Sequence, residues 1–254
     1  MSSLAISCIV FACILGGTLL GMILRARVPA EHLSSESKDV VKLGMGLIGT
    51  MTALVLGLLV ASAKSSFDTQ RNGLAQLSGN VIFLDRILAR YGKETKDARE
   101  MLHNSVDDLL KRTWPEEYPQ SGQSEAKGGT EGKYEGLYKM LEELTPKNDT
   151  QRTLQAQALK TAADIGQTRW LMFAQQGRSI PTPFLVVMVS WLALLFVSFS
   201  LFAPPNVTVF VTLLVCAFAV SSALFLILEL DQPFKGMIQI SSTPLRNALE
   251  QLGR

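Results

Sequence analysis

Hydrophobic residues are concentrated in four stretches of the chain, and a polar middle segment separates the first two from the last two. The stretches cover residues 4–24, 43–63, 184–203 and 207–228, and none contains Asp, Glu, Lys, Arg or His. Each holds 20 to 22 residues. An α-helix rises about 1.5 Å per residue, so each stretch is long enough to cross a hydrocarbon core of roughly 30 Å. The pattern predicts an integral membrane protein with four transmembrane helices.

A regular apolar stripe begins shortly after the second stretch. Its members recur in steps of three and four, which keeps them on one face of a helix: Leu74, Leu77, Val81, Leu84, Leu88 and Tyr91. No proline lies between the second stretch and this stripe, so we expect one long helix that leaves the membrane and enters the polar domain. The stripe is too short to indicate a coiled coil, which favours packing within the domain over an isolated zipper.

Three more helices are predicted in the middle segment. The first runs from Ala98 to Leu110 and stops near Trp114 and Pro115, because proline lacks an amide donor. Another covers residues 137–144, and the last begins near Leu154. Residues 116–133 are rich in Gly, Ser, Glu and Lys, which predicts a mobile loop.

The predicted fold class is an all-α membrane protein. Residues 1–63 and 183–228 supply two transmembrane helices each, and a helical cytoplasmic domain at 64–182 is inserted between the second and third. Residues 229–254 follow as a cytoplasmic C-terminal segment.

The distribution of charged residues predicts how the chain is oriented in the membrane, but it does not indicate a particular binding partner. The formal net charge is +2, and no basic run with interleaved aromatics is present, so the sequence does not favour nucleic acid as a partner. Lysine and arginine near span ends resist transfer across the membrane. Seven lie on the side of the middle domain and four on the other: Lys64, Arg71, Arg169, Arg178, Lys235, Arg246 and Arg254 against Arg25, Arg27, Lys38 and Lys42. We therefore expect the middle domain and both termini to be cytoplasmic, in a bacterial inner (plasma) membrane, with the first stretch retained as a helix.

The sequence contains no recognisable catalytic or metal-binding motif. His32 and His103 lie in separate regions and lack the spacing of a zinc site. The three cysteines, Cys8, Cys13 and Cys216, fall inside predicted spans, where they are expected to act as small hydrophobic residues. The expectation is a protein that is not an enzyme and that holds no cofactor and no metal.

Small residues form a stripe along the second stretch. Gly49, Ala53, Gly57 and Ala61 recur every four positions, which places them on one side of the helix. Small side chains let helix backbones approach closely in lipid. The stripe therefore predicts tight packing of this helix against a neighbour.

Several strings in the chain resemble those of a known family. Val55, Leu56 and Gly57 are similar to the Val-Leu-Gly segment in the pore-lining second helix of bestrophins. Over residues 53–252 the chain resembles the bestrophin-like DUF4239 family of bacterial and plant membrane proteins. The pieces most specific to that family lie at 169–181, 228–236 and 244–246.

The resemblance implies a particular role for the second helix. In bestrophins five copies of this helix surround a central axis, and three apolar side chains of each copy form a hydrophobic neck. The matching positions here are Thr50, Leu54 and Leu58, which are four residues apart and so share one helix face. The implied function is a homo-oligomeric, pentameric channel for an inorganic ion, gated by a constriction that excludes water.

The chain departs from the animal bestrophins after the fourth stretch, where those proteins have an acidic run that clasps calcium. This chain has Lys235, Gly236 and Met237 instead, so the sequence does not predict calcium binding. Glu229 and Asp231 are interpreted as a solvated span end, with ion attraction at the cytoplasmic mouth as the alternative.

Two other function classes compete with a channel. A membrane-anchored helical scaffold would use the spans only as an anchor and bind a cytoplasmic partner through its helical domain. Flagellar stator subunits also have four spans with a large insert, but proton-driven stators need ionisable groups at membrane depth, and the four stretches contain no charged residue.

Overall fold

The computed structural model describes residues 2–27, 35–118, 129–174, 180, 182–204 and 206–253. These residues form helices and connecting turns with no strand among them, which confirms the all-α fold class. The chain divides into two compact units. The membrane unit comprises Met1–Phe67 and Arg178–Ile238, and the extramembrane unit comprises Asp68–Gly177 and Gln239–Arg254.

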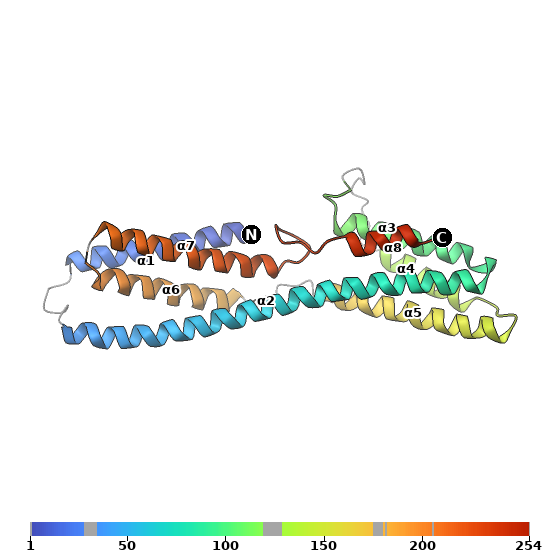
Figure 1. The fold of residues 1–254 in the computed structure, drawn as a ribbon, viewed down its shortest axis with the longest axis horizontal. Helices are drawn as coiled ribbons and strands as arrows, with labels where there is room; N and C mark the ends of the chain where they lie inside the picture. The colour runs from blue at the N-terminus through green and yellow to red at the C-terminus, as the bar shows by residue number, and fades with distance from the viewer. Residues whose placement is uncertain are drawn as a thin grey trace. The chain divides into compact units, whose positions relative to one another are not determined.

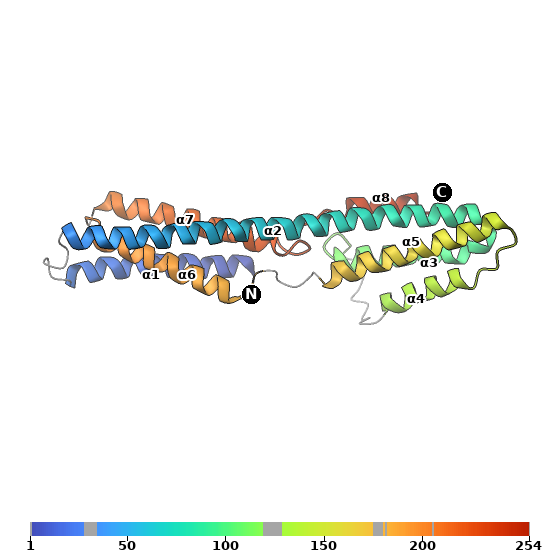
Figure 2. The same cartoon turned by 90° about the horizontal axis from the view of Figure 1, so that it is seen from below.

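The membrane unit contains the four predicted spans. They lie in α1 (Ser3–Arg27), the first part of α2 (Ser35–Tyr91), α6 (Thr182–Phe202) and α7 (Val207–Leu230). All four helices are long and apolar enough to cross a membrane. Helix α1 packs against both α6 and α7, and the three run side by side in Figures 1 and 2. Their shared core is apolar, and from α2 it includes Leu59 and Ala63.

The contact between α1 and α6 depends on two glycines. A Cβ atom built at Gly17 would lie 3.0 Å from the carbonyl oxygen of Ala193. One built at Gly21 would overlap the carbonyl oxygen of Val197 and the hydroxyl of Ser200. Glycine four residues apart is the pattern by which membrane helices bring their backbones together. The sequence interpretation placed such packing on the second helix and overlooked this pair on the first.

The extramembrane unit is a bundle of the remaining helices. It contains the rest of α2, a short 3-10 turn at Lys93–Thr95, α3 (Lys96–Thr113), α4 (Gly129–Glu142), α5 (Asp149–Ala174) and α8 (Thr243–Gln251). Helix α3 packs against α4 and α8, and α4 packs against α5. All six members of the predicted apolar stripe on α2 are buried: Leu74, Leu77, Val81, Leu84, Leu88 and Tyr91. Packing within the domain is therefore confirmed over an isolated zipper.

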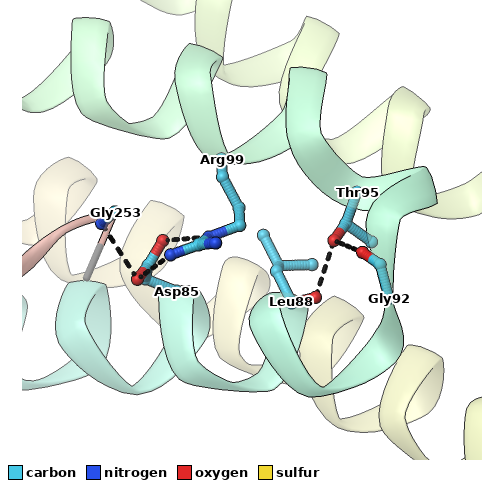
Figure 3. Close-up of polar contacts among 6 residues, drawn as sticks. All are labelled: Asp85, Leu88, Gly92, Thr95, Arg99 and Gly253. Carbon is cyan, nitrogen blue, oxygen red and sulfur yellow. Dashed lines mark hydrogen bonds and ion pairs between the residues drawn. The ribbon is translucent and has the colours of Figure 1, made fainter.

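The prediction of one long helix leaving the membrane is confirmed, because α2 continues without a break for 57 residues. It ends at Tyr91, and the next residue, Gly92, has a φ of 136°, which is rarely accessible to residues with a side chain. The Thr95 hydroxyl lies 2.6 Å from the carbonyl oxygen of Leu88 and 2.8 Å from that of Gly92 (Figure 3). Both carbonyls also accept a backbone N–H, that of Leu88 from Gly92 and that of Gly92 from Thr95, and the single hydroxyl proton is donated to one of them at a time.

Two predicted boundaries need correction. Helix α3 ends just before Trp114 and Pro115 as expected, but α4 begins at Gly129, so residues 129–133 of the predicted loop are helical. Residues 119–128 of that loop lie outside the described residues. The sequence predicts one C-terminal segment at residues 229–254, whereas the part up to Ile238 belongs to the membrane unit and the part from Gln239, with α8, belongs to the extramembrane unit.

Candidate pore-lining surface

The membrane segment of α2 is much less covered by its own chain than the other spans. Only 11% of its most apolar window is buried, compared with 28–33% for α1, α6 and α7. Among its exposed large apolar side chains, Val60 lies off the stripe and six recur in steps of three and four: Val40, Leu43, Leu47, Met51, Leu54 and Leu58. One face of α2 therefore lies open along the whole span.

The residues predicted to form a pore neck lie on this open face. Leu54 is 75% exposed and Leu58 is 67% exposed, and Thr50 is also exposed. The Thr50 hydroxyl donates a hydrogen bond of 2.8 Å to the carbonyl oxygen of Leu47, one turn earlier. This bond uses the only hydroxyl proton, but the oxygen can still accept. None of the three side chains points into the interior of its own membrane unit.

The opposite side of α2 packs against the core of its own membrane unit. Thr52, Leu59 and Ala63 are buried, and Val55 and Leu56 pack partly against the membrane core. Thr52 also satisfies its hydroxyl internally, through a 2.7 Å bond to the carbonyl oxygen of Ile48. The helix thus has one anchored face and one open face within the same span.

The predicted small-residue stripe lies beside the open face. Ala53, Gly57 and Ala61 are exposed and Gly49 is half-buried. No atom of another part of the chain lies within 4 Å of a Cβ built at Gly49 or Gly57. Within the described residues, the neighbour that this stripe was predicted to contact is therefore not a helix of the same chain.

Glu229 and Asp231 do not form a solvated span end, and that interpretation is wrong. They are only 4% and 7% exposed. The Glu229 carboxylate accepts a 2.6 Å hydrogen bond from the backbone N–H of Met237. Gly236 adopts a φ of 104°, and a Cβ there would overlap the same carboxylate. The buried Glu229 carboxylate therefore stabilises the turn that contains Gly236 and Met237. The linear sequence gives no sign of this role.

Another buried carboxylate lies in the extramembrane unit. Asp85 on α2 accepts two hydrogen bonds from Arg99 on α3, of 2.7 and 2.9 Å, and the N–H of Gly253 approaches it at 3.4 Å (Figure 3). The bonds to the carboxylate raise the pKa of Arg99. The pair joins α2, α3 and the end of the chain, and no sequence pattern identified it.

Groups for metal or nucleophilic chemistry do not gather in the part of the chain that the structure describes. No three His, Cys, Asp or Glu side chains lie close enough to hold a metal ion among those residues. Cys8, Cys13 and Cys216 are free thiols exposed on the surface of the membrane unit. His103 is exposed on α3, and His32 lies outside the described residues.

The fold defines an all-helical membrane protein with four spans and a helical extramembrane unit. The chain belongs to the family of the Bestrophin-like domain, whose model matches residues 12–245. The family resemblance stated from the sequence is thereby confirmed, while the narrower DUF4239 grouping stays a prediction. No curated protein matches the sequence.

Solved structures share the fold. A mutant of a bacterial Bestrophin homolog from Klebsiella pneumoniae is 16% identical, with a TM-score of 0.65, and the match covers 96% of this chain and 99% of that one. A second mutant of that homolog gives a TM-score of 0.66 at 15% identity, covering 96% and 98%. A further crystal structure, described as a membrane protein, gives 0.65 at 16% identity, covering 96% and 99%. At these identities the likeness shows the fold alone.

Proposed function

We propose that this protein is a homo-oligomeric ion channel, a pentamer in which the membrane segment of α2 from each copy lines an axial pore. The observation that carries the proposal is the open face of α2, whose Leu54 and Leu58 side chains are uncovered while the other three spans are more deeply packed. Membership in the Bestrophin-like family supports the same assignment.

The arrangement of stripes on α2 supports an assembly of several copies. Ala53 and Gly57 each precede a leucine of the neck by one residue, so the small stripe and the leucine stripe lie about 100° apart around the helix. A second copy packed closely against the small stripe turns the leucines toward a shared axis. Lipid would fill either stripe, but it gives no reason for small residues at every fourth position.

The proposed neck gates by excluding water. Rings of Leu54 and Leu58 present only apolar groups to the axis, and a narrow apolar constriction empties of water and blocks ions. The ring of Thr50 adds hydroxyl oxygens that can accept hydrogen bonds from water at one edge of the neck. The middle domain and the termini are cytoplasmic in this proposal, as the distribution of lysine and arginine near the span ends favours.

The experiment records current from purified protein in planar bilayers. Wild-type protein is expected to conduct, and the double variant Leu54→Ala, Leu58→Ala is expected to open more often because its constriction is wider and easier to wet. Leu194→Ala is the control, since Leu194 is an exposed leucine of α6, outside the proposed neck.

Native mass spectrometry from lipid supplies the subunit count. A monomer has no shared axis and would overturn the proposal. A stable oligomer that stays silent as wild type and as the double variant would favour the membrane-anchored scaffold instead.

A further inference from the structure

The last turn of α5 carries an exposed aromatic cluster. Trp170 and Phe173 are both 65% exposed, and Leu171 between them is 51% exposed. The two rings stack, with centroids 6.0 Å apart and planes 9° apart. Within the described part of the extramembrane unit, the only other large apolar side chain this exposed is Phe83. A concentrated apolar surface of this kind marks a site of interaction.

The remaining residue of the turn fixes its orientation. The Met172 carbonyl oxygen accepts a 3.3 Å hydrogen bond from the Gln70 side chain of α2. The Met172 side chain lies 3.2 Å from a Cβ built at Gly73. Met172 therefore holds the turn against α2, and the aromatic residues on either side of it are directed away from that contact.

In the sequence, the turn and its hydrogen-bonding partner on α2 are each only a few residues from a predicted span. Gln70 follows the end of the predicted second span, Ala63, by seven residues of helix, a rise of roughly 10 Å. Phe173 precedes the first residue of α6, Thr182, by nine residues. The headgroup layer begins at the edge of the hydrocarbon core and is roughly 5–8 Å deep on each side. By this count Gln70 lies just beyond that layer, so an aromatic side chain of the turn reaches the layer if it is directed toward the membrane.

We infer that the aromatic turn of α5, with Trp170 and Phe173, binds the headgroup layer of the bilayer and anchors the extramembrane unit to it. Tryptophan suits this layer because its ring is apolar while its N–H can bond to water or to lipid oxygens. Arg71, next to Gln70, is exposed and makes no ion pair among the described residues, so its guanidinium is available to lipid phosphate. The inference requires only a protein that spans the membrane and is independent of conduction.

Fluorescence quenching in nanodiscs tests the inference. The chain has three tryptophans, so the emission of Trp170 is obtained by subtracting the spectrum of Trp170→Phe from that of the wild type. Lipids brominated near the top of the acyl chain are expected to remove most of this component. Acrylamide, which is dissolved in water, is expected to quench it less than it quenches free tryptophan.

A matched reporter is obtained by adding Phe83→Trp to the Trp170→Phe variant. Phe83 is an exposed aromatic residue of the same unit, but it follows Ala63 by twenty residues. Brominated lipid is expected to leave its emission unchanged. Quenching of Trp170 by acrylamide alone would show a solvated turn, and quenching by neither agent would show a turn covered by another copy of the chain. Either result overturns the inference, whether or not the protein conducts.

Discussion

Replacing Arg99 by Met is expected to destabilise the extramembrane unit more than replacing Asp85 by Asn. The Asp85 side chain is 5% exposed, whereas that of Arg99 is 24% exposed. Arg99→Met therefore leaves a buried carboxylate whose remaining hydrogen bond among the described residues is the long one, 3.4 Å, from the N–H of Gly253. Asp85→Asn leaves a guanidinium that can turn toward water, and the amide oxygen can still accept one of its hydrogen bonds.

The magnitudes follow from this asymmetry. Removing one partner of a buried pair costs about 3–5 kcal/mol, because the other charge stays buried without compensation. Losing one charge-assisted hydrogen bond while the remaining cation is solvated costs about 1.5–3 kcal/mol. Adding Asp85→Asn to Arg99→Met removes the stranded charge, so the double variant is expected to recover part of the loss.

The assay is urea unfolding of the full chain in nanodiscs, followed through Trp114. This indole is buried in the extramembrane unit and donates a 2.9 Å hydrogen bond to the carbonyl oxygen of Ile240. Changing Trp170 and Trp191 to Phe makes Trp114 the only indole. Arg86→Met is the control, since Arg86 is the exposed neighbour of Asp85 on α2. A double variant as unstable as Arg99→Met alone, or an Arg99→Met no weaker than the control, would refute the reasoning.

Two other perturbations test the contacts of each unit. Gly21→Ala is expected to weaken the α1–α6 contact by about 1–3 kcal/mol because the new methyl group overlaps backbone atoms of α6. The control Gly16→Ala should be near neutral, since a Cβ at Gly16 meets open space. Unfolding in mixed micelles compares the two variants, and equal unfolding midpoints would contradict the close approach of α1 and α6 at Gly21. In the extramembrane unit, the 2.7 Å hydrogen bond from Lys147 lowers the pKa of Glu94 below its ordinary 4.5. A lowered pKa in the folded state gives stability that is present above pH 4.5 and is lost as pH falls through the folded value. Lys147→Gln should therefore make the urea midpoint fall less steeply as pH decreases on the acid side. The change should be small because both side chains are exposed. A slope identical to that of the wild type would contradict the stabilising role of the ion pair. Lys139→Gln, which changes the charge equally at another exposed pair, is the control.

Local patterns were sufficient to predict most helices. The spans follow from the length of four uncharged stretches, and the continuity of α2 follows from the absence of proline. The buried stripe from Leu74 to Tyr91 follows from apolar spacing, which depends only on neighbours three and four residues away. Helix α8 could have been found in the same way. Its buried Leu245 and Ala248 are spaced by three residues, and proline stands at its start.

Contacts between distant segments were not predictable from such patterns. Asp85 interrupts an apolar stripe, which signals a buried partner, but Arg99 lies beyond the Gly92 turn and only the packing of α3 on α2 selects it. Glu229 was misjudged for a related reason, because its partner is the backbone of Met237 and carries no side-chain signal. The glycines at 17 and 21 were readable as a motif, yet the motif does not say which helix approaches.

The membrane segment of α2 lies in lipid and the rest of the helix lies in water. This difference in solvent bears on the proposed assembly. Beyond the membrane, water forces the leucines of α2 into the core of their own chain, and every member of that stripe is buried. Inside the membrane lipid removes that force, so leucines such as Leu54 and Leu58 can stay uncovered without penalty. Lipid does not, however, explain why Ala53 and Gly57 keep a small, unoccupied stripe beside those leucines. Close packing of an identical helix on the small stripe, as in the proposed assembly, would account for it, and in that assembly the same packing would turn the leucines inward to form the proposed neck.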